Sequence, residues 1–412
     1  MRSSTIRACF RGLFEYLIAA ALLLNAHTIW LNDASTRSFF SLGLLVMLAL
    51  GVGGSLMLIR IRQTTLRNSA LVSCLLLLAA GAFYIVNPYH AGDLFKFVLA
   101  VILLYVYNAN CRAGRRAFAV LAKYRNLVVL LAALSTAVWY LATVARSLRP
   151  TGTVVMNWTG DGRDARYAAY YGLYFGVQTI AGGVWRNTSI FVEAPFAAFA
   201  FSMALLVELF LTPQDAGHGV GSLTRTAVLV IAMASTFSAT AYLVIGLSLS
   251  LAMLLRVRQR SLKRLVIGLL PLCAAVLGYA AACLVLRKLS TGSGAVHLDD
   301  YRVGWEAFAH APLFGNGFYH YDEVKRFMGS WRQHTTGLSN SPAAVMAFTG
   351  LFGTLPYALL WGRAIQSGLR DRRSTAFLGI LLLLFLAVMV PTDYAVLFAL
   401  LAFATGTNQE PC

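Results

Sequence analysis

Residues suited to chemistry gather in one polar stretch of the chain, residues 287–342, which lies between two apolar segments. Four of the seven histidines fall here, with arginines and carboxylates interspersed. Arginine binds phosphate through paired N–H groups, and histidine and carboxylate groups transfer protons near neutral pH. The pattern predicts an anion-binding site with an acid–base group. We expect the loop to form a lid over an active site, and the alternative is a surface loop with an interfacial helix. The alternative for the arginines is that they bind lipid headgroups. Among its titratable residues are His297, His310, His320, His334, Asp299, Asp300, Arg302, Glu306, Asp322, Glu323, Arg326 and Arg332.

This stretch leads into an apolar helix, through the sequence RQHTTGLSNSPAAVMAFTGLFG of residues 332–353. Ser341 suits the N-cap position, and Pro342 suits the first helical position. Free N–H groups and the helix dipole make such a terminus favourable for an anion. The sequence therefore predicts a phosphate site at this helix start. The residues that we expect to bind the anion are Arg302, Arg332, Ser339 and Asn340.

A short helix is predicted upstream, over residues 301–309 of the sequence DDYRVGWEAFAHAPLFGNGF. Its residues Trp305, Phe308 and Ala309 would share one face, which we expect to lie against the membrane surface. Trp305 is also a candidate substrate-binding residue. The glycines at 315–317 predict a tight turn after the helix.

A second polar element precedes the apolar run WRNTSIFVEAPFAAFAFSMALL of residues 185–206. Arg186 is expected at the membrane surface, and Glu193 about one turn inside the apolar run. A carboxylate at that depth is costly unless it is paired or faces a polar cavity. Pairing with Arg186 or Arg302 would reduce this energetic cost most simply. The alternative is that the Glu193 side chain extends to the membrane interface. Glu208 lies nearer the other membrane face and is expected to be structural.

The composition requires a membrane around these sites. The chain is 58% hydrophobic and 12% charged, with a mean hydropathy of +0.68. Long apolar runs recur throughout, so we predict an all-α, polytopic helical membrane protein with one integral membrane domain over 1–412 and about 12 spans. The predicted spans are 12–31, 39–59, 69–86, 94–109, 127–145, 190–211, 226–236, 239–255, 265–286, 343–362, 375–390 and 392–407.

The basic residues predict the orientation of these spans. Of the 34 Lys and Arg residues, 21 fall in segments that lie inside if the N-terminus is cytoplasmic, whereas the short outer segments hold only Arg37 and Lys96. This asymmetry places both termini in the cytoplasm. Two long external loops, 146–189 and 287–342, hold the other basic residues. Because the net charge of +18 follows from this membrane pattern, nucleic acid is not an expected partner. The six cysteines show no metal-ligand spacing, so no metal site is expected.

Several of these segments resemble the O-antigen polymerase and O-antigen ligase superfamily. NSPAAVMAFTGLFG, residues 340–353, resembles the signature H-N-S-x-L-x-x-L-x-E-x-G-x-x-G, and YRVGWEAFAHAPLFGNGF resembles the block R-x-x-x-W…P-L-x-G-x-G of a long periplasmic loop. RNTSIFVEAPFAAFAF resembles the R-x-x-G-x-F-x-E-P segment of polysaccharide polymerases. STFSATAYL lies where the family often has an S-R motif. In this chain Ser339 stands at the histidine of the signature and Ala239 at the arginine of the S-R motif.

The resemblance implies a periplasmic glycosyl transfer at the bacterial inner membrane. An undecaprenyl-diphosphate-linked oligosaccharide would be the donor. An acceptor hydroxyl would attack its anomeric carbon with inversion of configuration, and neither metal nor cofactor would take part. His334, Glu193 and Arg302 are the catalytic candidates, and Arg186 joins the substrate-binding residues. The favoured function is polymerisation of repeat units into exopolysaccharide or O-antigen, with a chain-length regulator, export machinery and membrane lipids as further partners. The alternatives are an O-antigen ligase that transfers glycan to lipid A core and a lipid-linked sugar transporter or flippase.

Overall fold

Apolar runs fold into helices over most of the chain, as expected for segments that must satisfy their backbone hydrogen bonds internally. The computed structural model describes residues 2–33, 35–59, 61, 63–111, 118–156, 165–180, 183–212, 220–256, 292–332, 337–388 and 392–405. Its first helices are α1 (Arg2–Leu24), α2 (Ile29–Asn32), α3 (Arg37–Met57), α4 (Gln63–Val86), α5 (Ala91–Cys111) and α6 (Ala119–Trp139). The later helices are α7 (Ala194–Leu206), α8 (Val220–Ser235), α9 (Ala239–Arg256), α11 (Gly292–His310), α12 (Tyr321–Lys325), α13 (Ser341–Gly368), α14 (Arg372–Ala387) and α15 (Tyr394–Thr405).

Seven of the described helical segments are long and apolar enough to cross a membrane. They are Arg37–Met57, Gln63–Val86, Ala91–Cys111, Ala119–Val144, Ala194–Leu211, Ala239–Arg256 and Ser341–Gly368. The prediction of a polytopic helical membrane protein is confirmed, and the number of 12 spans stays a prediction. The predicted span 265–286 lies outside the described residues.

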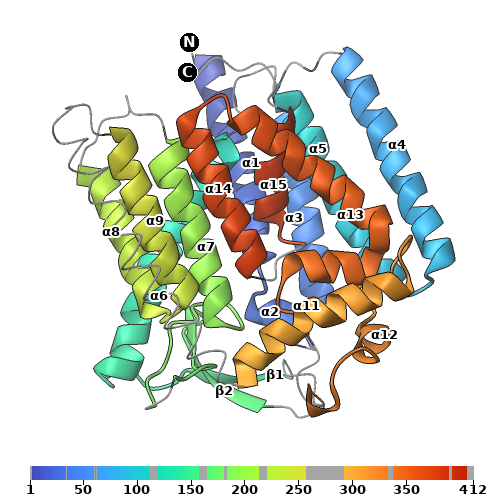
Figure 1. Cartoon of the computed structure of the whole chain (residues 1–412). Coiled ribbons are helices and arrows are strands. Elements are labelled where there is room, and N and C mark those ends of the chain that lie inside the picture. The colour runs from blue at the N-terminus through green and yellow to red at the C-terminus, as the bar shows by residue number, and fades with distance from the viewer. Residues whose placement is uncertain are drawn as a thin grey trace.

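The ends of the helix bundle differ in character (Figure 1). Both termini lie at one end, and the strands, α11 and α12 gather at the opposite end. We refer to this second end as the polar end. Because α11 and the strands come from the two long loops of the sequence, segments far apart along the chain meet there.

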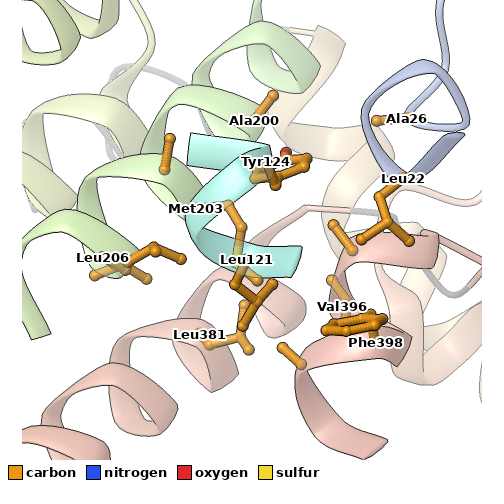
Figure 2. Packing of buried hydrophobic residues seen from close by; sticks show 14 of the residues in the cluster. Leu22, Ala26, Leu121, Tyr124, Ala200, Met203, Leu206, Leu381, Val396 and Phe398 are labelled. Atoms are coloured by element: carbon orange, nitrogen blue, oxygen red, sulfur yellow. The ribbon is translucent and has the colours of Figure 1, made fainter. Parts of the chain in front are cut away.

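The core is built around the late helix α15. All its residues from Tyr394 to Phe403 are buried, which requires other helices on every side. Figure 2 shows Leu22 of α1, Leu121 of α6 and Leu381 of α14 in this core, together with Phe398 of α15. The N-terminal and C-terminal helices are therefore packed into one apolar cluster.

Helices α14 and α15 are short for membrane spans. They contain 16 and 12 residues, which at about 1.5 Å per residue gives lengths well below a hydrocarbon core of about 30 Å. Neither helix alone is therefore long enough to cross the hydrocarbon core. The prediction of a break at 391–393 is confirmed by the two helix ends, and the break near Ser235–Ser238 is confirmed in the same way by α8 and α9.

The loop 146–189 adds a small sheet, which the sequence did not predict, to the mainly helical fold. Strands β1 (Gly152–Met156), β2 (Ala165–Tyr170) and β3 (Tyr174–Phe175) pair antiparallel in the order β1-β2-β3. Met156 and Phe175 bury their side chains with Ile29 of α2 and Val192. The sheet thus anchors the segment that leads into α7.

The helices α6 and α7 each end in a π-helical turn, Tyr140–Val144 and Val207–Leu211. The second turn carries Glu208, whose side chain is fully buried and forms ion pairs with Arg125 at 2.8 Å and Arg225 at 3.0 Å. Glu208 therefore links α6, α7 and α8, in agreement with the structural role expected for it.

Candidate functional site

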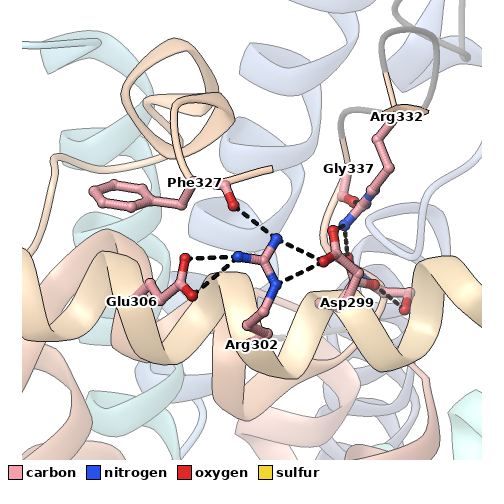
Figure 3. Close-up of polar contacts among 8 residues, drawn as sticks. Asp299, Arg302, Glu306, Phe327, Arg332 and Gly337 are labelled. Carbon is pink, nitrogen blue, oxygen red and sulfur yellow. Dashed lines mark hydrogen bonds and ion pairs between the residues drawn. The ribbon is translucent and has the colours of Figure 1, made fainter. Parts of the chain in front are cut away.

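The helix α11 presents a row of charged side chains at the polar end (Figure 3). Arg302 donates to Asp299 Oδ1 from Nε at 2.9 Å and from Nη2 at 2.7 Å. On its other side, Nη1 donates to both oxygens of Glu306 at 2.9 and 2.8 Å. Nη2 also donates to the carbonyl oxygen of Phe327 at 3.0 Å. The guanidinium is thus held between two carboxylates, each about one helical turn from Arg302 along α11.

Arg332 lies deeper in the same cluster. Its side chain has no exposed surface, and Nη1 forms ion pairs with Asp299 Oδ2 at 3.1 Å and with Asp300 Oδ1 at 2.8 Å. Nη2 donates to the carbonyl oxygen of Gly337 at 2.9 Å. A buried guanidinium requires such partners, because an uncompensated charge costs several kcal/mol in a protein interior.

Asp300 connects this cluster to the start of α13. Its Oδ2 accepts from the backbone N–H of Ser339 at 2.7 Å and from the Ser339 hydroxyl. Burial raises the pKa of Asp300 above its ordinary value, even though Ser339 and Arg332 favour the ionised form. Burial acts on Asp299 in the same direction, but the hydrogen bonds from Arg302 and Arg332 hold the pKa of that carboxyl below its ordinary value.

The N-cap of α13 is Asn340, which corrects the prediction of Ser341. Asn340 Oδ1 accepts from the backbone N–H of Ala343 at 2.9 Å, whereas Ser341 is fully buried and donates its hydroxyl to the carbonyl oxygen of Val388. Asn340 Nδ2 is buried and has no hydrogen-bond partner among the described residues. Ser341 is thus used to join α13 to the end of α14, and the amide of Asn340 takes the cap.

A kink in α13 explains the glycine-rich turn after α11. Gly350 adopts φ 57°, ψ −151°, which breaks the helix. The turn supplies the missing backbone partners: Pro312 and Leu313 accept from residues 351 and 352 at 2.8 and 2.9 Å. A Cβ on Gly315 would lie 2.5 Å from the backbone of Phe348, so a larger residue does not fit. The block PLFGNGF therefore locks the external loop onto the kink.

A second polar group surrounds Arg186 beside the turn between α8 and α9. Arg186 Nε donates to the carbonyl oxygen of Thr236 at 2.8 Å, and Nη2 donates to that of Phe237 at 3.3 Å. Gln178 accepts from Nη1 at 3.4 Å and from the backbone N–H of Ala194 at 3.0 Å. Burial lowers the pKa of Arg186, and the nearby charge of Glu193 acts in the opposite direction.

Glu193 is the N-cap residue of α7, so it lies at the start of the helix and not one turn inside it. Its electrostatic neighbour is Arg186. The alternative partner Arg302 is held by Asp299, Glu306 and Phe327, so that pairing is not formed. The structure therefore selects Arg186 as the arginine near Glu193.

The turn between α1 and α2 contacts the segment before α7 and the start of α15. The carbonyl oxygen of His27 accepts from the backbone N–H of Val192, and Asn25 Oδ1 accepts from that of Tyr394 at 3.0 Å. Tyr319, in the turn after α11, forms a hydrogen bond of 2.9 Å with Thr392, two residues before Tyr394. Segments around residues 25, 192, 319 and 392 thus form one connected network.

His27, Tyr319 and Asp393 were not site candidates from the sequence alone. Asp393 was interpreted only as a helix break, and it is 3% exposed, with Oδ1 capping α15 and Oδ2 without a hydrogen-bond partner among the described residues. A carboxylate beside a proline in an apolar run was the available signal.

The other sequence candidates fall in different places. Arg302, Arg332, Ser339 and Asn340 come together around α11 and the start of α13, as just described. Trp305 lies on α11 and is 61% exposed, on a different face from the charged row. His334 lies outside the described residues, so its position relative to this cluster stays a prediction.

Together these features define a helical membrane protein that carries the Arg302–Arg332 cluster and the start of α13 at the polar end of the bundle. The family model described as O-antigen ligase matches residues 226–358, a segment that runs from α8 through α11 into α13. The match confirms the resemblance to the O-antigen polymerase and ligase superfamily. A comparison with curated proteins gave no match.

Proposed function

We propose that this protein polymerises undecaprenyl-diphosphate-linked oligosaccharide repeat units into exopolysaccharide or O-antigen at the periplasmic face of the bacterial inner membrane. The observation that supports it most is the match to the O-antigen ligase family over residues 226–358. That segment holds both the charged row of α11 and the capped start of α13. The polar end would face the periplasm, because the basic residues of the short loops favour cytoplasmic termini.

The reaction would join two lipid-linked glycans. A hydroxyl oxygen of the acceptor sugar forms a bond to the anomeric carbon of the donor, and the bond from that carbon to the diphosphate oxygen breaks. The hydroxyl proton passes to a base, for which Glu193 and His334 are the candidates. The lipid diphosphate leaves as an anion, and neither a metal nor a cofactor is proposed.

Arg302 is better placed than Arg332 to receive that diphosphate. Its side chain is 47% exposed and its partner Glu306 is 42% exposed, whereas Arg332 is fully buried. Three carboxylates face the two arginines of this cluster, so the diphosphate would have to displace Glu306 from Arg302. An exposed ion pair contributes only about 0–1 kcal/mol, so this exchange is inexpensive. Arg332 would position the loop behind it.

A ligase is the second candidate, because the matching family model carries that description. The segment RNTSIFVEAPFAAFAF, which resembles polysaccharide polymerases, favours polymerisation. This segment contains Arg186, held on the turn between α8 and α9, and Glu193 at the start of α7. A lipid-linked sugar transporter is a third candidate, for which polar groups are expected in mid-membrane on several spans. The charged row of α11 lies at the polar end instead, which favours chemistry at the membrane surface.

Deleting the gene and sizing the lipid-linked and extracted glycans tests the proposal. Single repeat units that accumulate on lipid diphosphate, without long polymer, support a polymerase. Long polymer that remains on lipid diphosphate and is missing from lipid A indicates the ligase. Unchanged glycans would contradict both.

A further inference from the structure

The helix α11 has three faces with different surroundings. One face packs against α13: Val303 and Ala307 are fully buried, and a Cβ added to Gly304 would lie 2.4 Å from the Cβ of Ala343. The second face is the charged row, which contacts the segment that contains Phe327 and Arg332. Both faces therefore make contacts with other parts of this chain.

The third face is apolar and largely exposed. Leu298, Tyr301 and Trp305 are 60%, 57% and 61% exposed, respectively. Their spacing of three and four residues places them in one stripe along the helix. We call these three residues the apolar stripe. They are large side chains in a helix that is not one of the seven candidate membrane spans.

This stripe continues onto a helix that is long and apolar enough to cross a membrane. Leu313 follows α11, is 64% exposed, and accepts at its carbonyl oxygen from the backbone N–H of Phe352 at 2.9 Å. Beyond that point, α13 exposes Leu355 and Leu359, which are 54% and 68% exposed and one turn apart. Exposed leucines on such a helix are suited to face lipid. The apolar stripe therefore adjoins a lipid-facing surface.

We propose that α11 docks its apolar stripe into the surface of the lipid bilayer at the polar end of the bundle. An interfacial helix lies in the plane of the membrane, with its apolar face about 5–10 Å into the boundary between headgroups and acyl chains. Tyr and Trp are enriched at this level because one end of each ring is apolar and the other is polar.

A sugar-binding surface would be the other use of exposed aromatic rings. Leu298 and Leu313 argue against it, because aliphatic side chains have no polar groups to offer to a glycan. The continuity with Leu355 and Leu359 also has no use in sugar binding. A bilayer accounts for the aromatic and the aliphatic members together.

Docking would fix the position of the charged row. Asp299 and Asp300 lie on the same helix and hold Arg332 and Ser339. A helix that is held by α13 on one side and by lipid on another keeps these contacts in register. The inference concerns the location of α11 and holds whatever reaction the protein performs.

The test places a fluorescent thiol probe on the stripe. In a variant whose six native cysteines are replaced, Trp305→Cys carries a bimane label, and Ser330→Cys, an exposed position in the segment over the charged row, serves as the matched control. The labelled proteins are reconstituted into phosphatidylcholine–phosphatidylglycerol nanodiscs, with nitroxide-labelled lipid or with aqueous iodide as the quencher. Circular dichroism and thermal melting verify that both variants fold.

Docking predicts that nitroxide lipid removes most of the emission at position 305 and little at position 330, and that iodide does the reverse. Tyr301→Cys should behave like Trp305→Cys. Iodide quenching of both stripe positions, without quenching by lipid, would overturn the proposal. Protection from iodide that appears only when an oligosaccharide is added would also overturn it, in favour of a glycan surface.

Discussion

The side chains of Asp300 and Arg332 are fully buried. They join α11, the segment that contains Arg332, and the start of α13. Removing one partner of a buried pair leaves the other charge without full compensation, which costs about 3–5 kcal/mol. We therefore predict that Asp300→Ala lowers the free energy of unfolding by about that amount, measured as thermal melting in detergent. Asp322→Ala, which removes an exposed carboxylate paired with Lys325, should leave the melting temperature unchanged. Equal effects would show that burial is not the source of the stability.

The contacts of Arg186 depend on the planar geometry of its guanidinium group as well as on its charge. It donates to two carbonyl oxygens of the α8–α9 turn and to Gln178. A lysine keeps the charge but lacks the planar fork, so it cannot make these contacts together. We predict that Arg186→Lys reduces polymer about 100-fold, the scale of a misplaced catalytic group. Polymer length and yield on gels provide the measurement.

The control for that substitution is Arg166→Ala, because Arg166 is exposed on β2. It should leave polymer unchanged. Normal polymer from both Arg186→Lys and Arg186→Ala would remove Arg186 from the proposed site.

We expect His27 to make the stability of the folded protein depend on pH, which its position in the sequence does not suggest. It lies in the turn after α1 and stacks on Phe196 with ring centroids 4.4 Å apart. Burial, with a smaller effect from Arg37, lowers the pKa of His27 from 6.5 to about 4. Between these values the unfolded chain binds the proton and the folded protein does not, so stability falls as the pH drops through this window.

We predict that His27→Phe flattens that dependence, because a phenyl ring keeps the stacking and cannot be protonated. Melting temperatures measured between pH 6.5 and about pH 4 make the comparison with the unsubstituted protein. A variant that still loses stability as steeply as the parent would assign the dependence to other groups.

At the scale of elements, the kink in α13 is the feature on which the external loop depends. Gly350 has φ 57°, and a Cβ there would lie 2.5 Å from the backbone N of Gly315. We predict that Gly350→Ala lowers the free energy of unfolding by about 1–3 kcal/mol, as overpacking does, and reduces polymer. Gly362→Ala is the matched control, because it lies in the same helix with no atom within 4 Å of an added Cβ. Its melting temperature should stay the same or rise slightly.

The sequence predicted those element boundaries that have a local chemical cause. Hydroxyl residues at 235–238 and a proline with a charge at 391–393 indicated the breaks, and the structure has helix ends at both. The start of α13 was one residue off, because both Asn340 and Ser341 suit a cap and only the contact with Val388 decides between them. How deeply α14 and α15 are buried in the bundle depends on their packing against other helices. The hydropathy of the sequence contains no information about that packing.

At the scale of the whole molecule, the sequence predicted where chemistry would gather but not how the groups connect. It grouped Arg302, Arg332 and Ser339, and the structure joins them through Asp299 and Asp300. It did not predict the turn at 25–28, because the contacts of Asn25 with Tyr394 and of His27 with Val192 span long stretches of chain. Such contacts follow from the arrangement of the bundle.

The proposed function requires that this chain itself extends glycan on lipid diphosphate. The most direct measurement is to reconstitute the purified protein in liposomes with undecaprenyl-diphosphate-linked repeat units and to size the products. We predict a ladder of glycans still attached to lipid diphosphate, with one lipid diphosphate released for each linkage formed, and no ladder with Arg302→Ala. Glycan that forms no ladder, or that moves only onto added lipid A core, would contradict it.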